Sequence, residues 1–144
     1  MNIQLADIRL GKIVLTSLLI IIVVFVIIAA VVAVYAFILG AEARGSPDPQ
    51  QIQLFARRIG SIWGPIVGTV ATLSGAVWMT RRLPNTQLVH GALVGAIIAL
   101  VGLIAGKFSL RSILISLAIF LAGFTGGIFS AWYQKHRSAS KQET

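Results

Sequence analysis

The longest apolar run in this sequence, from Ile13 to Leu39, contains no charged side chain. About 20 apolar residues in an α-helix cross the hydrocarbon core of a bilayer, so this run can span a membrane with tilt or protrude from it. The apolar part of a cleaved signal peptide is only about 7–15 residues long. The run is therefore interpreted as an uncleaved membrane span.

Three further apolar segments, at about 59–79, 88–106 and 110–132, have the length and composition of membrane spans. Of the 144 residues, 57% are hydrophobic and 11% are charged, whereas about 25% of a typical soluble domain is charged. A soluble chain of this size has too little interior to bury so much apolar surface. The sequence predicts an all-α integral membrane protein, a four-transmembrane-helix bundle. Its parts are a short basic N-terminal segment (1–12), one membrane domain (13–133, first span 13–39) and a polar basic tail (134–144), which we expect to be mobile.

Local signals place the helix boundaries. Asp48 followed by Pro49 is typical of a helix start, because the carboxylate caps the helix and proline fits its first position. This predicts that the second helix begins outside the membrane, with an amphipathic stretch over 50–58. Asn85 or Thr86 is a candidate cap for the third helix, and Ser109 for the fourth. The connection between the last two spans is so short that they are predicted to form an antiparallel hairpin.

Small residues recur on one face of each later span. Successive residues of a helix are about 100° apart, so spacings of three, four and seven fall on one side. The predicted helix-packing residues are Gly60, Gly64, Gly68, Gly75, Gly91, Gly95, Gly102, Gly106, Gly123 and Gly127. Bulky aliphatic side chains lie on the opposite faces and are predicted to meet lipid.

Glycine stripes favour helix–helix contact in a membrane. Lipid tails are as apolar as leucine, so close backbone approach holds membrane helices together, and small side chains permit that approach. The stripes therefore predict a compact bundle with glycine inside. A pathway lined by the same faces is the alternative interpretation.

The positive charges predict a topology. With four spans, both termini and the middle loop share one side, which carries Arg9, Lys12, Arg81, Arg82, Lys135, Arg137 and Lys141. The other side carries Arg44, Arg57, Arg58, Lys107 and Arg111. Because Lys and Arg are more frequent in cytoplasmic loops, both termini are predicted to be cytoplasmic. The pairs Arg57, Arg58 and Arg81, Arg82 are candidate contacts for anionic lipid or a partner.

The sequence shows no constellation that would do chemistry. All four acids, Asp7, Glu42, Asp48 and Glu143, lie outside the predicted spans, and cysteine is absent. His90 is the one histidine near a span, and we interpret it as an interfacial polar residue without a metal or haem. No catalytic, cofactor or metal site is predicted.

The polar groups within the spans are hydroxyls. Thr69, Thr72, Ser112, Ser116 and Ser130 are candidates for interhelical hydrogen bonds or for lining a pathway. Pro65 is expected to leave a backbone carbonyl near Ser61 without its helical donor and to kink the second span.

We expect a non-enzymatic structural, accessory or regulatory subunit that packs with itself or with a larger membrane complex, in contact with membrane lipids and without nucleic acid. The alternative is a small homo-oligomeric channel or transporter for an ion or small molecule. An intramembrane enzyme is the least favoured interpretation, since no acid, base, nucleophile and metal ligand converge.

Overall fold

The computed structural model describes residues 10–43, 45, 47–81 and 86–139 and is all-helical there. The helices are α1 (Leu10–Glu42), α2 (Pro49–Thr80), α3 (Gln87–Ala105) and α4 (Leu110–Ala139). Each is long and apolar enough to cross a membrane. The prediction of an all-helical protein with four helices long and apolar enough to span a membrane is therefore confirmed.

Two of the predicted helix starts are confirmed by their hydrogen bonds. The Asp48 side chain accepts a hydrogen bond from the Gln50 amide at 2.8 Å, and Pro49 is the first residue of α2. At the start of α4, the Ser109 hydroxyl accepts from the Ser112 amide at 3.2 Å. The predicted cap of α3 is different: Thr86 occupies the cap position, but its side chain makes no capping hydrogen bond. The other candidate, Asn85, lies outside the described residues.

α3 and α4 form the predicted antiparallel hairpin, with more mutual contacts than any other pair of helices. The turn between them is tight. Lys107 and Phe108 both have φ of 54°, in the left-handed region that side chains other than glycine rarely adopt. This backbone lets the chain reverse between Gly106 and Ser109.

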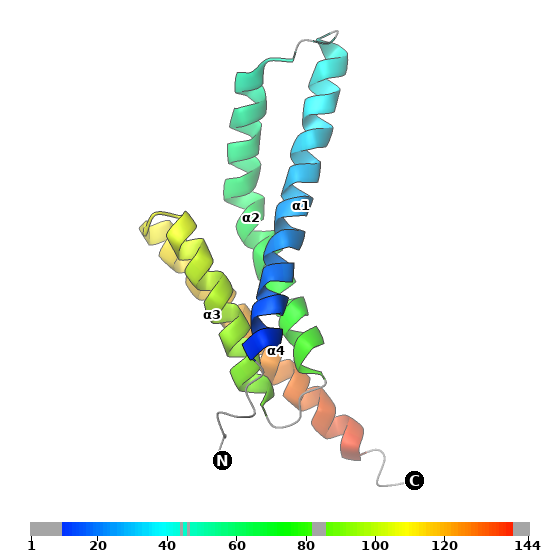
Figure 1. The fold of residues 1–144 in the computed structure, drawn as a ribbon, viewed down its shortest axis with the longest axis vertical. Helices are drawn as coiled ribbons and strands as arrows, with labels where there is room; N and C mark the ends of the chain where they lie inside the picture. Colours follow the sequence, from blue (N-terminus) through cyan, green and yellow to red (C-terminus); the bar gives the residue numbers. More distant parts are fainter. Residues whose placement is uncertain (1–9, 44, 46, 82–85, 140–144) are drawn as a thin grey trace.

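The four helices meet at one end of the molecule, where α1 begins and α4 ends (Figure 1). We call this part the closed half and define it as residues 10–24, 68–80, 86–98 and 119–135. Its apolar core contains side chains from every helix, namely Ile13, Ile20, Met79, Val94, Ile98 and Ile119.

Towards the other end, the α1–α2 hairpin and the α3–α4 hairpin diverge (Figure 1). We call this part, comprising 25–42, 49–67, 99–105 and 110–118, the open half. The α3–α4 turn lies level with Ser61, because the Arg111 side chain bonds to the Ser61 carbonyl oxygen. At 1.5 Å per residue, α2 continues for about 18 Å beyond that level to Pro49.

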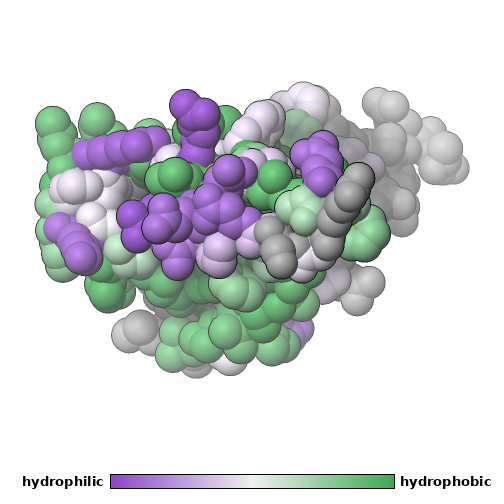
Figure 2. Space-filling view, turned by 90° about the horizontal axis from the view of Figure 1, so that it is seen from above, coloured by the Kyte–Doolittle hydropathy of each residue, from purple (hydrophilic) through white to green (hydrophobic). Residues whose placement is uncertain are grey.

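The outermost part of the α1–α2 hairpin, residues 34–42 and 49–58, is named the projecting arm. Its helices are joined by the stacked rings of Tyr35 and Phe55, whose centroids are 3.7 Å apart. Seen from this end, polar residues gather over the middle of the molecule, with apolar surface beside them (Figure 2).

Helix α4 continues beyond its predicted membrane part, through Ala139, into the segment predicted to be a mobile tail. The Gln134 side chain bonds to two other parts of the chain. Its oxygen accepts a hydrogen bond from the Gln87 side chain of α3, and its nitrogen donates to the backbone carbonyl of Arg81, directly after α2. These bonds hold the first turn of the predicted tail against the bundle. Residues 140–144 lie outside the described residues.

Candidate functional site

The closest contact between two helices runs through glycines of α3 and α4. A Cβ atom added at Gly91 would lie 2.6 Å from the Gly123 carbonyl oxygen, and one at Gly95 would lie 2.9 Å from the Phe120 carbonyl oxygen. In the reverse direction, a Cβ at Gly123 would lie 2.7 Å from the Gly95 Cα, and Gly127 is equally close to Gln87. No side chain larger than hydrogen fits at these positions without movement of a backbone.

Gly75 and Gly68 of α2 face side chains of neighbouring helices and not their backbones. A Cβ at Gly75 would collide with the Ile20 side chain of α1, and one at Gly68 would lie 3.9 Å from Ile119. Gly60 and Gly64 have no atom of the described protein within 4 Å of such a Cβ. The structure therefore does not bring these last two against another helix.

Gly102 and Gly106 of the α3 stripe face serines of α4. An ideal Cβ at Gly102 is 3.6 Å from the Ser116 hydroxyl oxygen, and one at Gly106 meets the Ser112 side chain. Here the α3–α4 contact passes through small side chains. It has room for a Cβ at Gly102, whereas a Cβ at Gly106 would collide with Ser112.

Sequence reasoning missed Gly126. A Cβ there would lie 2.9 Å from Ala76 and 3.0 Å from the Leu73 carbonyl oxygen, so Gly126 forms the close contact between α4 and α2. Around the helix axis it lies about 60° from Gly123 and about 100° from Gly127. The signal was the adjacent pair Gly126–Gly127, which lets one helix approach two neighbours.

The bulky faces opposite the glycines point outward. Ile62, Ile66, Val70, Leu117 and Leu121 are all exposed. On α3, Leu100 and Ile104 are exposed, and Leu93 and Ile97 are partly buried against the core. These surfaces are available to lipid or to another protein.

The intramembrane hydroxyls bond within their own segments. The Thr69 hydroxyl donates to the Pro65 carbonyl at 2.8 Å, and the Thr72 hydroxyl to the Gly68 carbonyl at 2.7 Å. The Ser112 hydroxyl donates to the Ser109 carbonyl at 2.7 Å. Among the described residues, the buried hydroxyls of Ser116 and Ser130 have no hydrogen-bond partner. The five candidate side chains thus form no hydrogen-bonded chain between helices.

One basic side chain does cross between helices. Proline has no amide hydrogen, so Pro65 cannot donate to the carbonyl of Ser61 as an ordinary helical residue would. That carbonyl instead accepts a hydrogen bond of 2.7 Å from the Arg111 guanidinium. Pro65 and Arg111, which the sequence analysis treated separately, are therefore parts of one contact, while α2 remains helical through Pro65.

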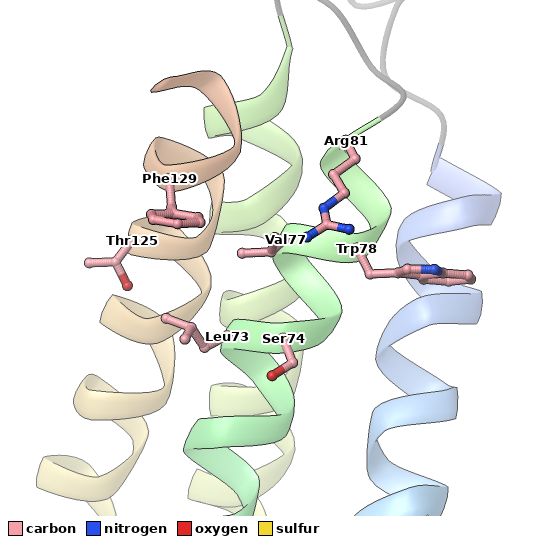
Figure 3. A pocket seen from close by; sticks show the side chains of 7 residues that line it. All are labelled: Leu73, Ser74, Val77, Trp78, Arg81, Thr125 and Phe129. Carbon is pink, nitrogen blue, oxygen red and sulfur yellow. The ribbon is translucent and has the colours of Figure 1, made fainter. Parts of the chain in front are cut away.

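Of the arginines predicted to contact lipid or a partner, Arg57 and Arg58 lie in the third turn of α2, and Arg81 follows its last residue. Arg57, Arg58 and Arg81 are exposed, and Arg82 lies outside the described residues. Arg81 lines a pocket of about 450 Å³ between α2 and α4. Figure 3 shows its apolar walls, with Leu73 and Val77 on α2 facing Phe129 on α4.

His90 is fully buried in the closed half, and its Nδ1 lies 2.8 Å from the Thr86 carbonyl oxygen. α3 turns this side chain into the bundle, and its position at the membrane interface stays a prediction. Within the described ranges, no three His, Cys, Asp or Glu side chains gather as a metal site requires.

A larger cavity, with a volume of about 720 Å³, lies between the two hairpins, mainly in the open half, and reaches Ile20, Gly68 and Ile119 of the closed half. We call it the interhairpin groove. Its lining is mostly apolar, comes from all four helices and includes Gly60, Gly64 and Gly102. Arg111 is the charged residue of the lining.

Comparison with known proteins found no protein-family model, no curated protein and no solved structure that matches this chain.

Proposed function

We propose that this protein is a non-enzymatic accessory subunit of a larger membrane complex and that the projecting arm binds the larger partner. The observation that carries this proposal is the exposed apolar surface of the arm. Phe37 is 78% exposed, and Val34, Ile38 and Leu54 are exposed as well.

The arm extends beyond a group of basic side chains on α2 and at the α3–α4 turn. Arg57 and Arg58 are exposed on α2, and Lys107 and Arg111 lie at the α3–α4 turn, about one helical turn away along α2. Basic side chains at the ends of membrane helices place their charges in the interface with water. The apolar side chains of the arm then stand at or beyond the lipid headgroups, where a contiguous apolar surface is typical of a protein-binding site.

In this proposal, the closed half is a rigid base that holds the arm in place. The glycine faces of α3 and α4 act as helix-packing surfaces, because each allows the other backbone to approach closely. Both termini are cytoplasmic, as the charge distribution predicts, and the arm is on the opposite side of the membrane.

The test is purification of the tagged protein in mild detergent, followed by native mass spectrometry of the intact complex. We expect a larger partner in fixed stoichiometry. Phe37→Ser should release it, because the side chain is exposed on the arm. The matched control is Phe108→Ser, which removes another exposed phenylalanine at the α3–α4 turn and should leave the complex intact.

Two results would contradict the proposal. One is equal retention of the partner by both variants, which would exclude the arm as its binding site. The other is a homo-oligomer without any larger partner. The homo-oligomer would favour the channel or transporter interpretation and would justify flux measurements in proteoliposomes.

A further inference from the structure

The interhairpin groove combines an apolar floor with one cation at its end. Along α4 it extends from Ser109 and Arg111 to Ile119, and along α2 from Gly60 to Gly68. Ten residues of helix rise about 15 Å, which is half of the roughly 30 Å hydrocarbon core of a bilayer. The groove therefore has the depth of one lipid leaflet, from the interface to the middle of the membrane.

The floor of the groove is shaped by missing side chains. Gly60 and Gly64 of α2 have no atom within 4 Å of an ideal Cβ, and Gly102 of α3 lies across from them in the same lining. Ile20, Phe25 and Ile115 add apolar walls. The volume of about 720 Å³ falls within the range of about 300–1,000 Å³ that small-molecule sites occupy.

The cation is held in a fixed position. One guanidinium nitrogen of Arg111 donates to the Ser61 carbonyl, which leaves its other N–H groups available to an acceptor. Arginine binds phosphate oxygens through several N–H groups at once, in charge-assisted hydrogen bonds. Ser109 and Ser61 also line this end. Their hydroxyls donate to Ser112 and to the Arg58 carbonyl, so Arg111 is the donor that we assign to the phosphate.

From this geometry we propose that the interhairpin groove is a binding site for one anionic phospholipid. An acyl chain lies along Gly64 and Gly102, and the phosphate is bound by Arg111. The site is separate from the projecting arm, and the inference does not depend on the proposed accessory function.

Charge complementarity favours a lipid over a second copy of this chain. An apolar helix laid into the groove would cover the Arg111 guanidinium without supplying an anion, and an unpaired buried charge is costly. A phospholipid matches both features of the groove. Its phosphate is an anion at the level of Arg111, and its acyl chain is long enough to lie along the apolar lining.

The test is reconstitution of the full chain into nanodiscs that contain equal amounts of phosphatidylglycerol and phosphatidylcholine, followed by native mass spectrometry of the lipids that remain bound. We expect one tightly bound phospholipid with a preference for phosphatidylglycerol. Arg111→Gln should reduce this preference by about fivefold, as expected for one basic residue near a lipid surface.

A second variant tests the chain-binding part without removing charge. Gly64→Leu places a side chain in the groove, where an ideal Cβ has no atom of the described residues within 4 Å, and should reduce lipid retention by about tenfold. Gly11→Leu is its matched control, since Gly11 is exposed and also has no atom within 4 Å of an ideal Cβ. Lys12→Gln is the control for charge, because Lys12 is exposed and does not line the groove.

The proposal is overturned if the unmodified protein retains both phospholipids equally or if Gly64→Leu and Gly11→Leu behave alike. It is also overturned if the unmodified protein forms a dimer without bound lipid and Gly64→Leu converts that dimer to monomers. This result would assign the groove to a second copy of the chain.

Discussion

The two halves of this molecule contain the same kinds of residues but are packed differently. Apart from Ser112 and Ser116, every buried residue in the described chain belongs to the closed half. There the four helices share one core, and polar side chains such as Thr72, Thr80 and His90 are completely buried. In the open half, two hairpins separate around an apolar groove.

Glycine alone does not explain this difference, because both halves are rich in it. In the closed half, Gly91 and Gly95 face Gly123 across the α3–α4 contact, so that both backbones are bare where they meet. In the open half, Gly60 and Gly64 face a groove. Two membrane helices approach closely where small residues of one helix face small residues of the other. A stripe of small residues on one helix alone is therefore not sufficient.

The largest expected effect comes from the same substitution made in each half. Gly95→Ile places a side chain against the Phe120 backbone of α4, at a point where even a Cβ would be 2.9 Å from the carbonyl oxygen. Since neither backbone can yield as a side chain does, we expect a loss of about 3 kcal/mol in the free energy of unfolding. Gly60→Ile, in the open half, should change it by no more than about 0.5 kcal/mol.

The measurement is reversible unfolding in mixed detergent and SDS micelles, followed by circular dichroism. Ile97→Leu is a control for ordinary side-chain change on α3. Equal tolerance of Gly95→Ile and Gly60→Ile would show that the two halves are packed alike and that the closed half is not the more tightly packed one.

The sequence predicted the number and order of the helices well. Apolar length alone identifies the spans, and local chemistry placed the starts at Pro49 and Leu110, because Asp48 and Ser109 act on amides only two or three residues away. The periodicity of one helix defines its faces, so the stripes predicted which sides of α3 and α4 pack, and Gly91 and Gly95 lie close to the backbone of α4.

The site was much less predictable, because it depends on how separate helices are placed. No periodicity shows that Gly60 and Gly64 face a groove while Gly91 and Gly95 face a backbone. The freed carbonyl at Ser61 followed from Pro65, yet its donor lies 50 residues along the chain, on Arg111. Burial of His90 likewise depends on the tilt of α3 in the bundle.

The next effect tests the contact that links the two hairpins in the open half. Arg111→Gln should lower the free energy of unfolding by about 1 kcal/mol, since it removes a charged donor from the Ser61 carbonyl. Pro65→Ala restores a helical amide donor to that carbonyl, so the cost of Arg111→Gln should be smaller in this background.

A double-mutant cycle on these two positions measures their coupling free energy, for which we expect about 0.5 kcal/mol or more. Arg58→Gln, which changes an exposed arginine outside the groove lining, should show no coupling to Pro65→Ala. Additive effects at 65 and 111 would mean that the arginine does not replace the missing helical donor.

In the closed half, the hydrogen bond between Gln87 and Gln134 should have less influence on the positions of the helices. Gln87→Leu removes the hydrogen bond between the Gln87 amide and the Gln134 side chain, at a cost of about 0.6 kcal/mol. The glycine contacts beside it keep α3 and α4 together. Spin labels at Leu88 and Phe129, both exposed, should therefore keep the same distance distribution in electron paramagnetic resonance. Arg111→Gln should instead broaden the distance distribution between spin labels at Ile62 and Leu114.

The smallest effect is expected for a buried hydroxyl of the closed half. Thr72 is fully buried, but its hydroxyl donates to the Gly68 carbonyl of its own helix, which also accepts the backbone amide of Thr72 in a regular helix. Thr72→Val keeps the shape of the side chain and leaves that carbonyl bonded, so the free energy of unfolding should change by less than about 0.5 kcal/mol. A larger loss would mean that the hydroxyl bonds across the bundle, and that burial in the closed half depends on polar contacts between helices as well as on close backbone approach.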